Sequence, residues 1–153
     1  MFRPAALLAL LAAAPAFAQD GIAPTVTDCT GWQANAANIA EPWEENTRTF
    51  ANGNVRLTLI DTVEPVGGWA WLMIQSPPYD ELGLRQCRMI GNWNSGFSRL
   101  DFNELFADYN PEDGLIFDIP AGIYVNGTED DPVFPMRIIL NQSTGQIETY
   151  VFD

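Results

Sequence analysis

Residues 47–60 read TRTFANGNVRLTLI, a short run ending in Phe50 and a run of alternating apolar and polar residues, on either side of Asn52 and Gly53. An Asn-Gly pair favours the positive φ angles that a tight hairpin turn requires, so the two runs are predicted to pair as antiparallel strands. Arg56 and Thr58 are expected to face outward, because successive side chains of a strand point to opposite faces. The alternate residues expected to face a core are Val55, Leu57 and Leu59.

The next apolar stretch, residues 69–74, reads WAWLMI and has no polar residue at either parity. This pattern predicts a strand that is covered on both faces. The residues Ser-Pro-Pro-Tyr at 76–79 are expected to end it. Trp69 and Trp71 are two residues apart, so on a strand they share one face.

Further short strands are predicted around this centre, over residues 84–93, 115–125, 136–140 and 147–152. Gly145 takes a left-handed position in the loop before the last of these strands. Helical spacing predicts two short helices, over residues 32–40 and 99–107. The pattern indicates a mainly β fold in one domain, residues 27–153: a single antiparallel β-sandwich or partly open barrel with one or two short helices.

The first 18 residues have the pattern of a secretory signal peptide: Arg3, an apolar run over residues 5–14, and a small-residue end at Ala18. The apolar run is too short to span a bilayer, and no later segment reads as a membrane span. Cleavage would leave residues 19–26 as an extended lead-in. We therefore expect a periplasmic or secreted protein of bacterial type.

Cys29 and Cys87 are the only cysteines. In a chain exported to an oxidising compartment, their default interpretation is one disulfide. It would close a loop of roughly 59 residues, and the lower entropy of the unfolded chain would then stabilise the fold by about 4 kcal/mol. A reactive thiol is the alternative, but the chain has no Cys-x-x-Cys spacing and no histidine that would activate a thiolate.

The charge is strongly acidic, with 20 Asp and Glu against 7 Lys and Arg and a formal net charge of −13. Every basic residue is an arginine, and the chain contains no histidine. These absences exclude Ser-His-Asp and Cys-His nucleophile systems, imidazole metal ligands and lysine Schiff bases. Nucleic acid is not an expected partner, because there is no basic patch to neutralise phosphates.

The candidate binding residues are aromatic or basic. Trp43 lies on a predicted loop beside several glutamates, where it is expected to be exposed, whereas Trp69 and Trp71 would bind a sugar or peptide only if they are not part of the core. Arg85 and Arg88 could receive a carboxylate or phosphate, but pairing with the surrounding acids is the favoured interpretation. Because they have opposite parity on one strand, their two guanidinium groups could bind the same anion only if a bulge intervened.

The acidic turn at residues 108–114 is the candidate metal site. It resembles the opening of a calcium loop, but its glycine falls one position late and the place of the bidentate glutamate is taken by Ile119, so an EF-hand is rejected. A looser Ca²⁺ site remains open, as does one at residues 129–131; otherwise these are solvated turn residues. The proposed ligands are Asp108, Asn110, Glu112 and Asp113.

These observations favour a small exported, non-catalytic domain that binds or docks to a protein or saccharide partner whose identity the sequence does not give. Two alternatives belong to other classes. One is a carboxylate-dependent, glycosidase-like hydrolase, which would need two carboxylates facing each other in a cleft. The other is an extracytoplasmic module stabilised by calcium.

Overall fold

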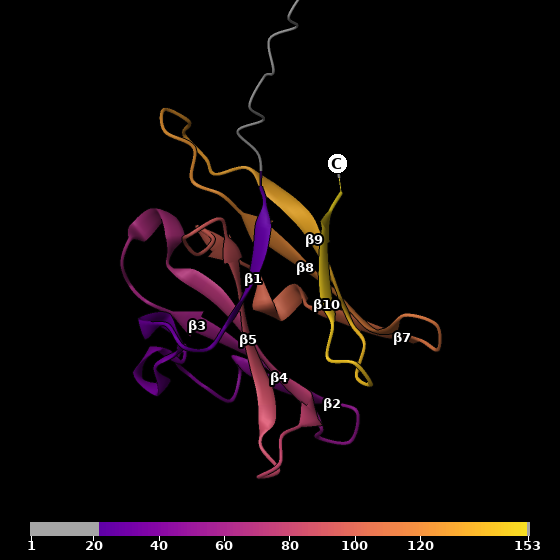
Figure 1. The fold of residues 1–153 in the computed structure, drawn as a ribbon. Helices are drawn as coiled ribbons and strands as arrows, with labels where there is room; N and C mark the ends of the chain where they lie inside the picture. The colour runs from indigo at the N-terminus through magenta and orange to yellow at the C-terminus, as the bar shows by residue number, and fades with distance from the viewer. Residues whose placement is uncertain (1–21, 153) are drawn as a thin grey trace, which may run out of the picture.

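A computed structural model describes residues 22–152, so the predicted signal peptide lies outside the described residues. Two antiparallel sheets face each other (Figure 1). Sheet A has the order β1-β5-β4-β3-β2; its strands are β1 (Pro24–Asp28), β2 (Thr47–Phe50), β3 (Val55–Asp61), β4 (Ala70–Tyr79) and β5 (Arg85–Asn92). Sheet B has the order β10-β9-β8-β6, with β7 also paired to β8; its strands are β6 (Arg99–Leu100), β7 (Phe106–Asn110), β8 (Gly114–Gly122), β9 (Val133–Leu140) and β10 (Ile147–Val151).

The helical content of the described residues is four three-residue 3₁₀ turns, η1 (Trp32–Ala34), η2 (Ala36–Asn38), η3 (Val66–Gly68) and η4 (Phe102–Glu104). Residues 22–152 hold no helix of the length and apolarity that crossing a bilayer demands. Neither sheet closes on itself within this range, and Cys29 and Cys87 form the predicted disulfide. The prediction of a mainly β, antiparallel, disulfide-linked fold is confirmed.

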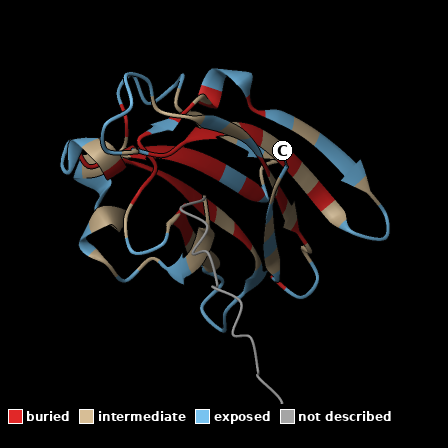
Figure 2. Cartoon of the chain, turned by 90° about the horizontal axis from the view of Figure 1, so that it is seen from above, coloured by how far each residue is buried: buried red, intermediate tan, exposed pale blue. Residues whose placement is uncertain are grey.

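The main core lies between the two sheets, where the buried residues gather in Figure 2. Leu57, Ile74 and Ile90 enter it from sheet A, and Phe117 and Ile138 enter it from sheet B. The ring of Phe117 meets that of Phe50 edge to face, at a centroid distance of 4.9 Å. This core uses the inward parity of the strands, as the alternating pattern of the sequence predicts.

The predicted hairpin at residues 47–60 is confirmed, with a wider turn than two residues. Phe50 pairs with Val55, so residues 51–54 form the turn. Ala51, Asn52 and Gly53 all have positive φ angles, of 51°, 56° and 84°. The Asn-Gly pair thus supplies two of the three left-handed positions on which the turn depends.

Sheet A has a second, smaller core on its outer face. Trp71, Met73 and Met89 are buried there with Ile60. Residues 29–46, which we call the covering segment, pack over this cluster through Ile39 and neighbouring residues; in Figure 1 they are the indigo loops beside β3. The double-sided apolar pattern of residues 69–74 is therefore explained, because the central strand β4 is covered on both faces.

The predicted helix over residues 99–107 is wrong. Arg99 and Leu100 pair with β8, one 3₁₀ turn follows, and β7 returns along β8. Asp101 and Leu105 have ψ angles of 75° and 117°, so they break any continuous helix. The four-residue spacing of aromatic residues suggested a helical face, but the unpaired edge of β8 offered these residues a full set of backbone hydrogen bonds.

The predicted helix over residues 32–40 is reduced to η1 and η2. Asn35 separates them with a ψ angle of 138°, and its side-chain oxygen accepts a hydrogen bond from the backbone N–H of Ala37 at 2.9 Å. Asparagine commonly bonds nearby backbone in this way, in competition with helix continuation.

The predicted end of β4 at residues 76–79 is also wrong, because the strand runs on to Tyr79. Ser76 pairs with Gln86 and Tyr79 pairs with Arg85, so the two prolines fall in an irregularity between these pairs. A bulge leaves its extra residues outside the ladder, where a missing N–H costs no inter-strand bond.

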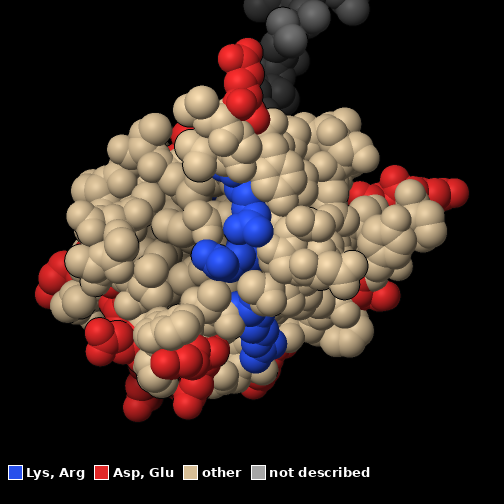
Figure 3. Space-filling model, turned by 90° about the horizontal axis from the view of Figure 1, so that it is seen from below, with Lys and Arg blue, Asp and Glu red and all other residues tan. Residues whose placement is uncertain are grey.

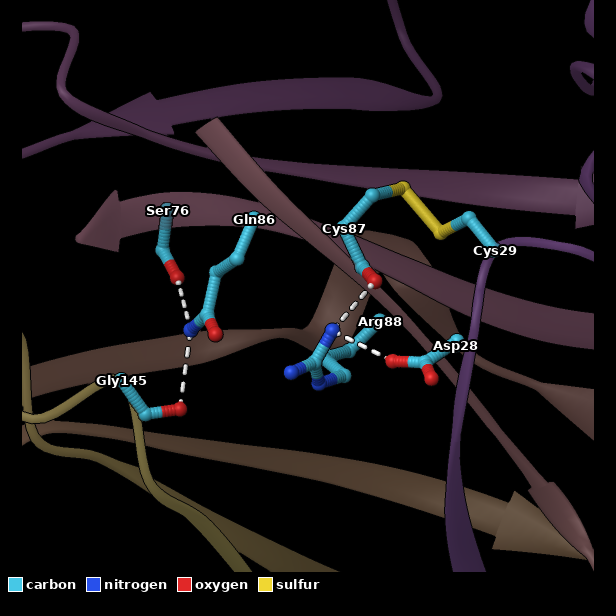
Figure 4. Close-up of polar contacts among 7 residues, drawn as sticks. All are labelled: Asp28, Cys29, Ser76, Gln86, Cys87, Arg88 and Gly145. Carbon is cyan, nitrogen blue, oxygen red and sulfur yellow. Dashed lines mark hydrogen bonds and ion pairs between the residues drawn. A yellow bond between two sulfur atoms is a disulfide. The ribbon is translucent and has the colours of Figure 1, made fainter. Parts of the chain in front are cut away.

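Polar contacts connect the two sheets at one end of the sandwich (Figure 4). The side-chain amide of Gln86, on β5, donates to Ser76 Oγ at 2.9 Å and to the carbonyl of Gly145, in the β9–β10 turn, at 2.8 Å. Gly145 has a φ angle of 77°, which confirms its predicted left-handed position. A Cβ atom there would lie 2.5 Å from Pro78, so this contact requires glycine.

Candidate functional site: a groove on the outer face of sheet A

A groove of about 700 Å³ lies between the outer face of sheet A and the covering segment. Three strands supply its floor, and β5 adds Cys87 of the disulfide. The floor residues from β2, β3 and β4 are Thr47, Thr49, Arg56, Thr58, Met73 and Gln75. All of them have the outward parity opposite to the core residues, so the same alternation that builds the core also builds the groove.

Strand register arranges the floor in two rows that run across the sheet. In the first row Thr49 pairs with Arg56, Arg56 with Gln75, and Gln75 with Cys87. Side chains directly opposite each other on adjacent strands have Cβ atoms about 5 Å apart, so the guanidinium stem of Arg56 stands between a hydroxyl and an amide.

The second row is more apolar. In it Thr47 pairs with Thr58, and Thr58 pairs with Met73. Met73 belongs to the outer-face cluster, where Cys87 and Ile39 pack against it. The groove therefore has a polar row beside a largely apolar one.

The polar side chains of the groove are not used to hold the fold. Within residues 22–152, no side-chain hydrogen bond or ion pair involves Glu44, Thr49, Arg56 or Gln75. The other five described arginines are each engaged: Arg48 with the carbonyls of Asn103 and Leu105, Arg85 with the carbonyl of Gly53, Arg88 with Asp28, Arg99 with Asp101, and Arg137 with Asp118. Arg56 alone among these six keeps its donors for solvent or a ligand.

Trp43 and Glu44 form the rim of the groove on the covering segment. The backbone N–H groups of Glu45 and Asn46 donate to the carbonyl of Pro42, at 3.1 and 3.2 Å, which closes a turn around Trp43. The Trp43 side chain is 60% exposed, as the sequence predicts. It is the predicted binding residue that the structure places in the groove.

Trp69 and Trp71 do not share a strand face, so that expectation is wrong. Trp69 follows η3 in a helical conformation and packs, partly buried, against the core between the sheets. Trp71 lies in β4 and is 7% exposed in the outer-face cluster. The two rings serve packing on opposite sides of sheet A and present no exposed aromatic pair.

Arg85 and Arg88 lie in a separate cleft of about 310 Å³. Both line this cleft despite their opposite parity, beside the irregularity in β4 between Ser76 and Tyr79. Arg88 pairs with Asp28 at 2.6 Å and also donates to the carbonyl of Cys87 at 3.1 Å (Figure 4). Figure 3 shows that arginines form one stripe across the face seen from below, with acidic side chains toward its edges.

The proposed calcium ligands lie in the β7–β8 hairpin. The side-chain amide of Asn110 donates to Asp113 at 2.8 Å, and its oxygen accepts from the backbone N–H of Glu112 at 2.9 Å. Asp108 caps the backbone N–H of Tyr109 at 2.7 Å. Across residues 22–152 no group of three or more His, Cys, Asp or Glu side chains is placed to hold a metal ion.

Three carboxylates, Glu112, Asp113 and Glu148, line a small pocket of about 200 Å³. All three are exposed, and Glu148 also accepts hydrogen bonds from Gln146 and Tyr150. An acid–base pair for glycoside hydrolysis needs one carboxylate in a desolvating setting. The buried polar residues of the described chain are Thr58, Thr62, Ser76 and Ser98, none of which is acidic.

Sequence reasoning missed the groove itself, although it assigned Arg56 and Thr58 to the outward face. The missing information was the path of residues 29–46, which turns that face into a cavity wall. Comparisons with protein-family models, with curated proteins and with solved structures find no match to this chain, so the groove is interpreted from its own geometry.

Proposed function

We propose that this chain is an exported, non-catalytic binding domain and that the groove on sheet A receives a small organic ligand with an apolar part. The predicted leader over residues 1–18 supports export, and the disulfide is compatible with an oxidising compartment. Under this proposal, native material has the intact mass of residues 19–153. Retention of Met1 in the mature protein would contradict export.

The observation that carries the binding proposal is a groove whose polar side chains have no partner in the fold. Ligand sites are typically 300–1,000 Å³, mostly apolar, with a few convergent polar groups. The groove is of this size, and its apolar wall includes Met73, Ile39 and the disulfide. Its exposed Arg56 and Thr49 offer hydrogen bonds that no described residue uses.

The first experiment titrates the protein with N-phenyl-1-naphthylamine, a neutral apolar dye that fluoresces when it leaves water. We expect saturable binding at one site. Thr49→Trp fills the groove from its exposed floor and should weaken binding at least tenfold, whereas Thr144→Trp, in the exposed β9–β10 turn, should not. Equal affinity in both variants and in the unmodified protein would overturn the groove as the binding site.

A second pair of variants tests the rim. Trp43 and Trp32 are both exposed tryptophans of the covering segment, at 60% and 65%, but only Trp43 lines the groove. Trp43→Ala should weaken dye binding about three- to tenfold, as expected for loss of an aromatic contact. Trp32→Ala is the matched control, and an equal loss in both variants would contradict a specific role for the rim.

A further inference from the structure

We propose that the ligand of the groove is a monocarboxylate with an apolar body, held through its carboxylate by Arg56. This inference rests on the proposed binding function and specifies its ligand class. The apolar body would lie along Met73, in the second row of the floor, and along the disulfide, whose Cys87 ends the first row.

The first step of the argument is charge. The chain has a net charge of −13, yet Arg56 forms no ion pair with any described acid. The residues directly opposite Arg56 on the neighbouring strands are Thr49 and Gln75, both neutral, so cross-strand pairing gives Arg56 no acidic partner. Glu44 lines the same groove but forms no ion pair with Arg56, so this exposed guanidinium remains free for an external anion.

The second step is the set of donors around Arg56. A guanidinium presents parallel N–H groups that match the two oxygens of a carboxylate. The Thr49 hydroxyl and the Gln75 amide stand on either side, at the Cβ spacing of cross-strand neighbours, about 5 Å. Each of these side chains has a donor that no other described residue engages, so the polar row offers converging hydrogen bonds to one anionic group.

The third step is the position of the apolar surface. Thr58 and Met73 lie two residues along the strands from Arg56 and Gln75, which is about 7 Å. Cys87 and Ile39 extend this surface toward the covering segment, with the rim residue Trp43 above the opening. A ligand that satisfies both rows therefore carries its charge at one end and its apolar part at the other.

The fourth step limits the ligand to one negative charge. Glu44 is the only carboxylate among the residues that line the groove, and it forms no ion pair with Arg56. A second carboxylate on the ligand would have no described cation to receive it, because Arg56 is the single basic residue of the lining. It would also be drawn into apolar surroundings, at a desolvation cost.

The test displaces bound N-phenyl-1-naphthylamine with decanoate, decan-1-ol and decanedioate at neutral pH and physiological salt. Decanoate should displace the dye at a concentration at least tenfold lower than decan-1-ol, because charge-assisted hydrogen bonds are the stronger ones. It should have a similar advantage over decanedioate, because the second carboxylate of that ligand has no cation in the groove. Arg56→Gln should abolish the preference for decanoate over decan-1-ol. Arg99→Gln, a surface arginine of sheet B, should preserve it.

The outcomes separate this inference from the proposed function. If the dye binds in the groove but decan-1-ol competes as well as decanoate, or Arg56→Gln keeps the preference, the carboxylate assignment is overturned and the binding site stands. If decanedioate equals decanoate, the restriction to one charge is overturned. If the dye does not bind at all, both proposals fail together.

Discussion

Reduction of the Cys29–Cys87 disulfide should destabilise the fold and loosen one wall of the groove. The bond joins the start of the covering segment to the centre of β5, across a sequence separation of 58 residues. Beside it, β1 pairs with β5 as far as Asp28 and Arg88, whose side chains also form an ion pair, so the bond adds a covalent attachment at that end. The far end is held separately, because Ala40 N donates to the Leu59 carbonyl at 3.0 Å and Leu59 N donates to the Asn46 carbonyl at 2.9 Å.

The expected loss follows from the length of the loop that the bond closes. For this separation, loop-closure entropy in the unfolded chain corresponds to about 4 kcal/mol. A domain of ordinary stability has about 5–15 kcal/mol in total, so the reduced protein should be much less stable but still folded in many conditions. The unfolded chain should also become more expanded without the crosslink, which raises the denaturant dependence of the free energy of unfolding.

The assay is urea unfolding of the oxidised protein, of the same protein after phosphine reduction, and of the Cys29→Ala/Cys87→Ala double variant. The reduced and double-variant proteins should agree with each other and unfold with a free energy about 4 kcal/mol lower. The dye affinity of the groove should fall in both, since both cysteines line its wall. A loss below about 1 kcal/mol would refute the reasoning, because noncovalent packing would then hold the segment on its own.

Four further outcomes are expected. Val63 is 72% exposed and has a φ angle of 64°, so Val63→Gly should raise the free energy of unfolding by about 1 kcal/mol in a urea titration. Val66 is equally exposed but does not have a positive φ angle, so Val66→Gly should lower the free energy of unfolding in the same titration. Phe117 is fully buried between the sheets, and Phe117→Ala should cost about 3–5 kcal/mol by urea unfolding. Gln86→Ala removes the link between Ser76 Oγ and the β9–β10 turn and should cost about 1–3 kcal/mol, with faster amide hydrogen exchange in that turn. Calcium binding at residues 108–113 stays a prediction: it requires a higher melting temperature in millimolar calcium than in EDTA, and an unchanged temperature would exclude a structural ion there.

Alternation of residues was the most informative sequence signal. Together with the Asn-Gly turn signal it identified the hairpin at residues 47–60, and its absence at residues 69–74 identified the doubly covered strand. It failed at residues 99–107, where the paired partner is the edge of β8. β6 and β7 form because β8 offers an edge for pairing, which residues 99–107 alone do not reveal.

The candidate site was less accessible to sequence reasoning. Trp43 was identified because an aromatic residue among glutamates is unusual in a loop. Arg56 was not identified as a candidate binding residue, because its proposed role depends on the absence of an ion-pair partner. Such partners are set by the strand register and by the folded covering segment. That Arg88 pairs with an acid was expected, but the identity of that acid, Asp28, follows only from the pairing of β1 with β5.

The turn at residues 51–54 has a consequence for recognition as well as for folding. A slip of β3 by a single residue against its neighbours would send Arg56 into the interior and put Leu57 in the groove, because every side chain would exchange faces. The backbone geometry of Asn52 and Gly53 thus helps to set which side chains of β3 face the groove and which face the core. A one-residue insertion at this corner that shifted β3 would remove the proposed charge preference of the groove although every lining residue kept its identity.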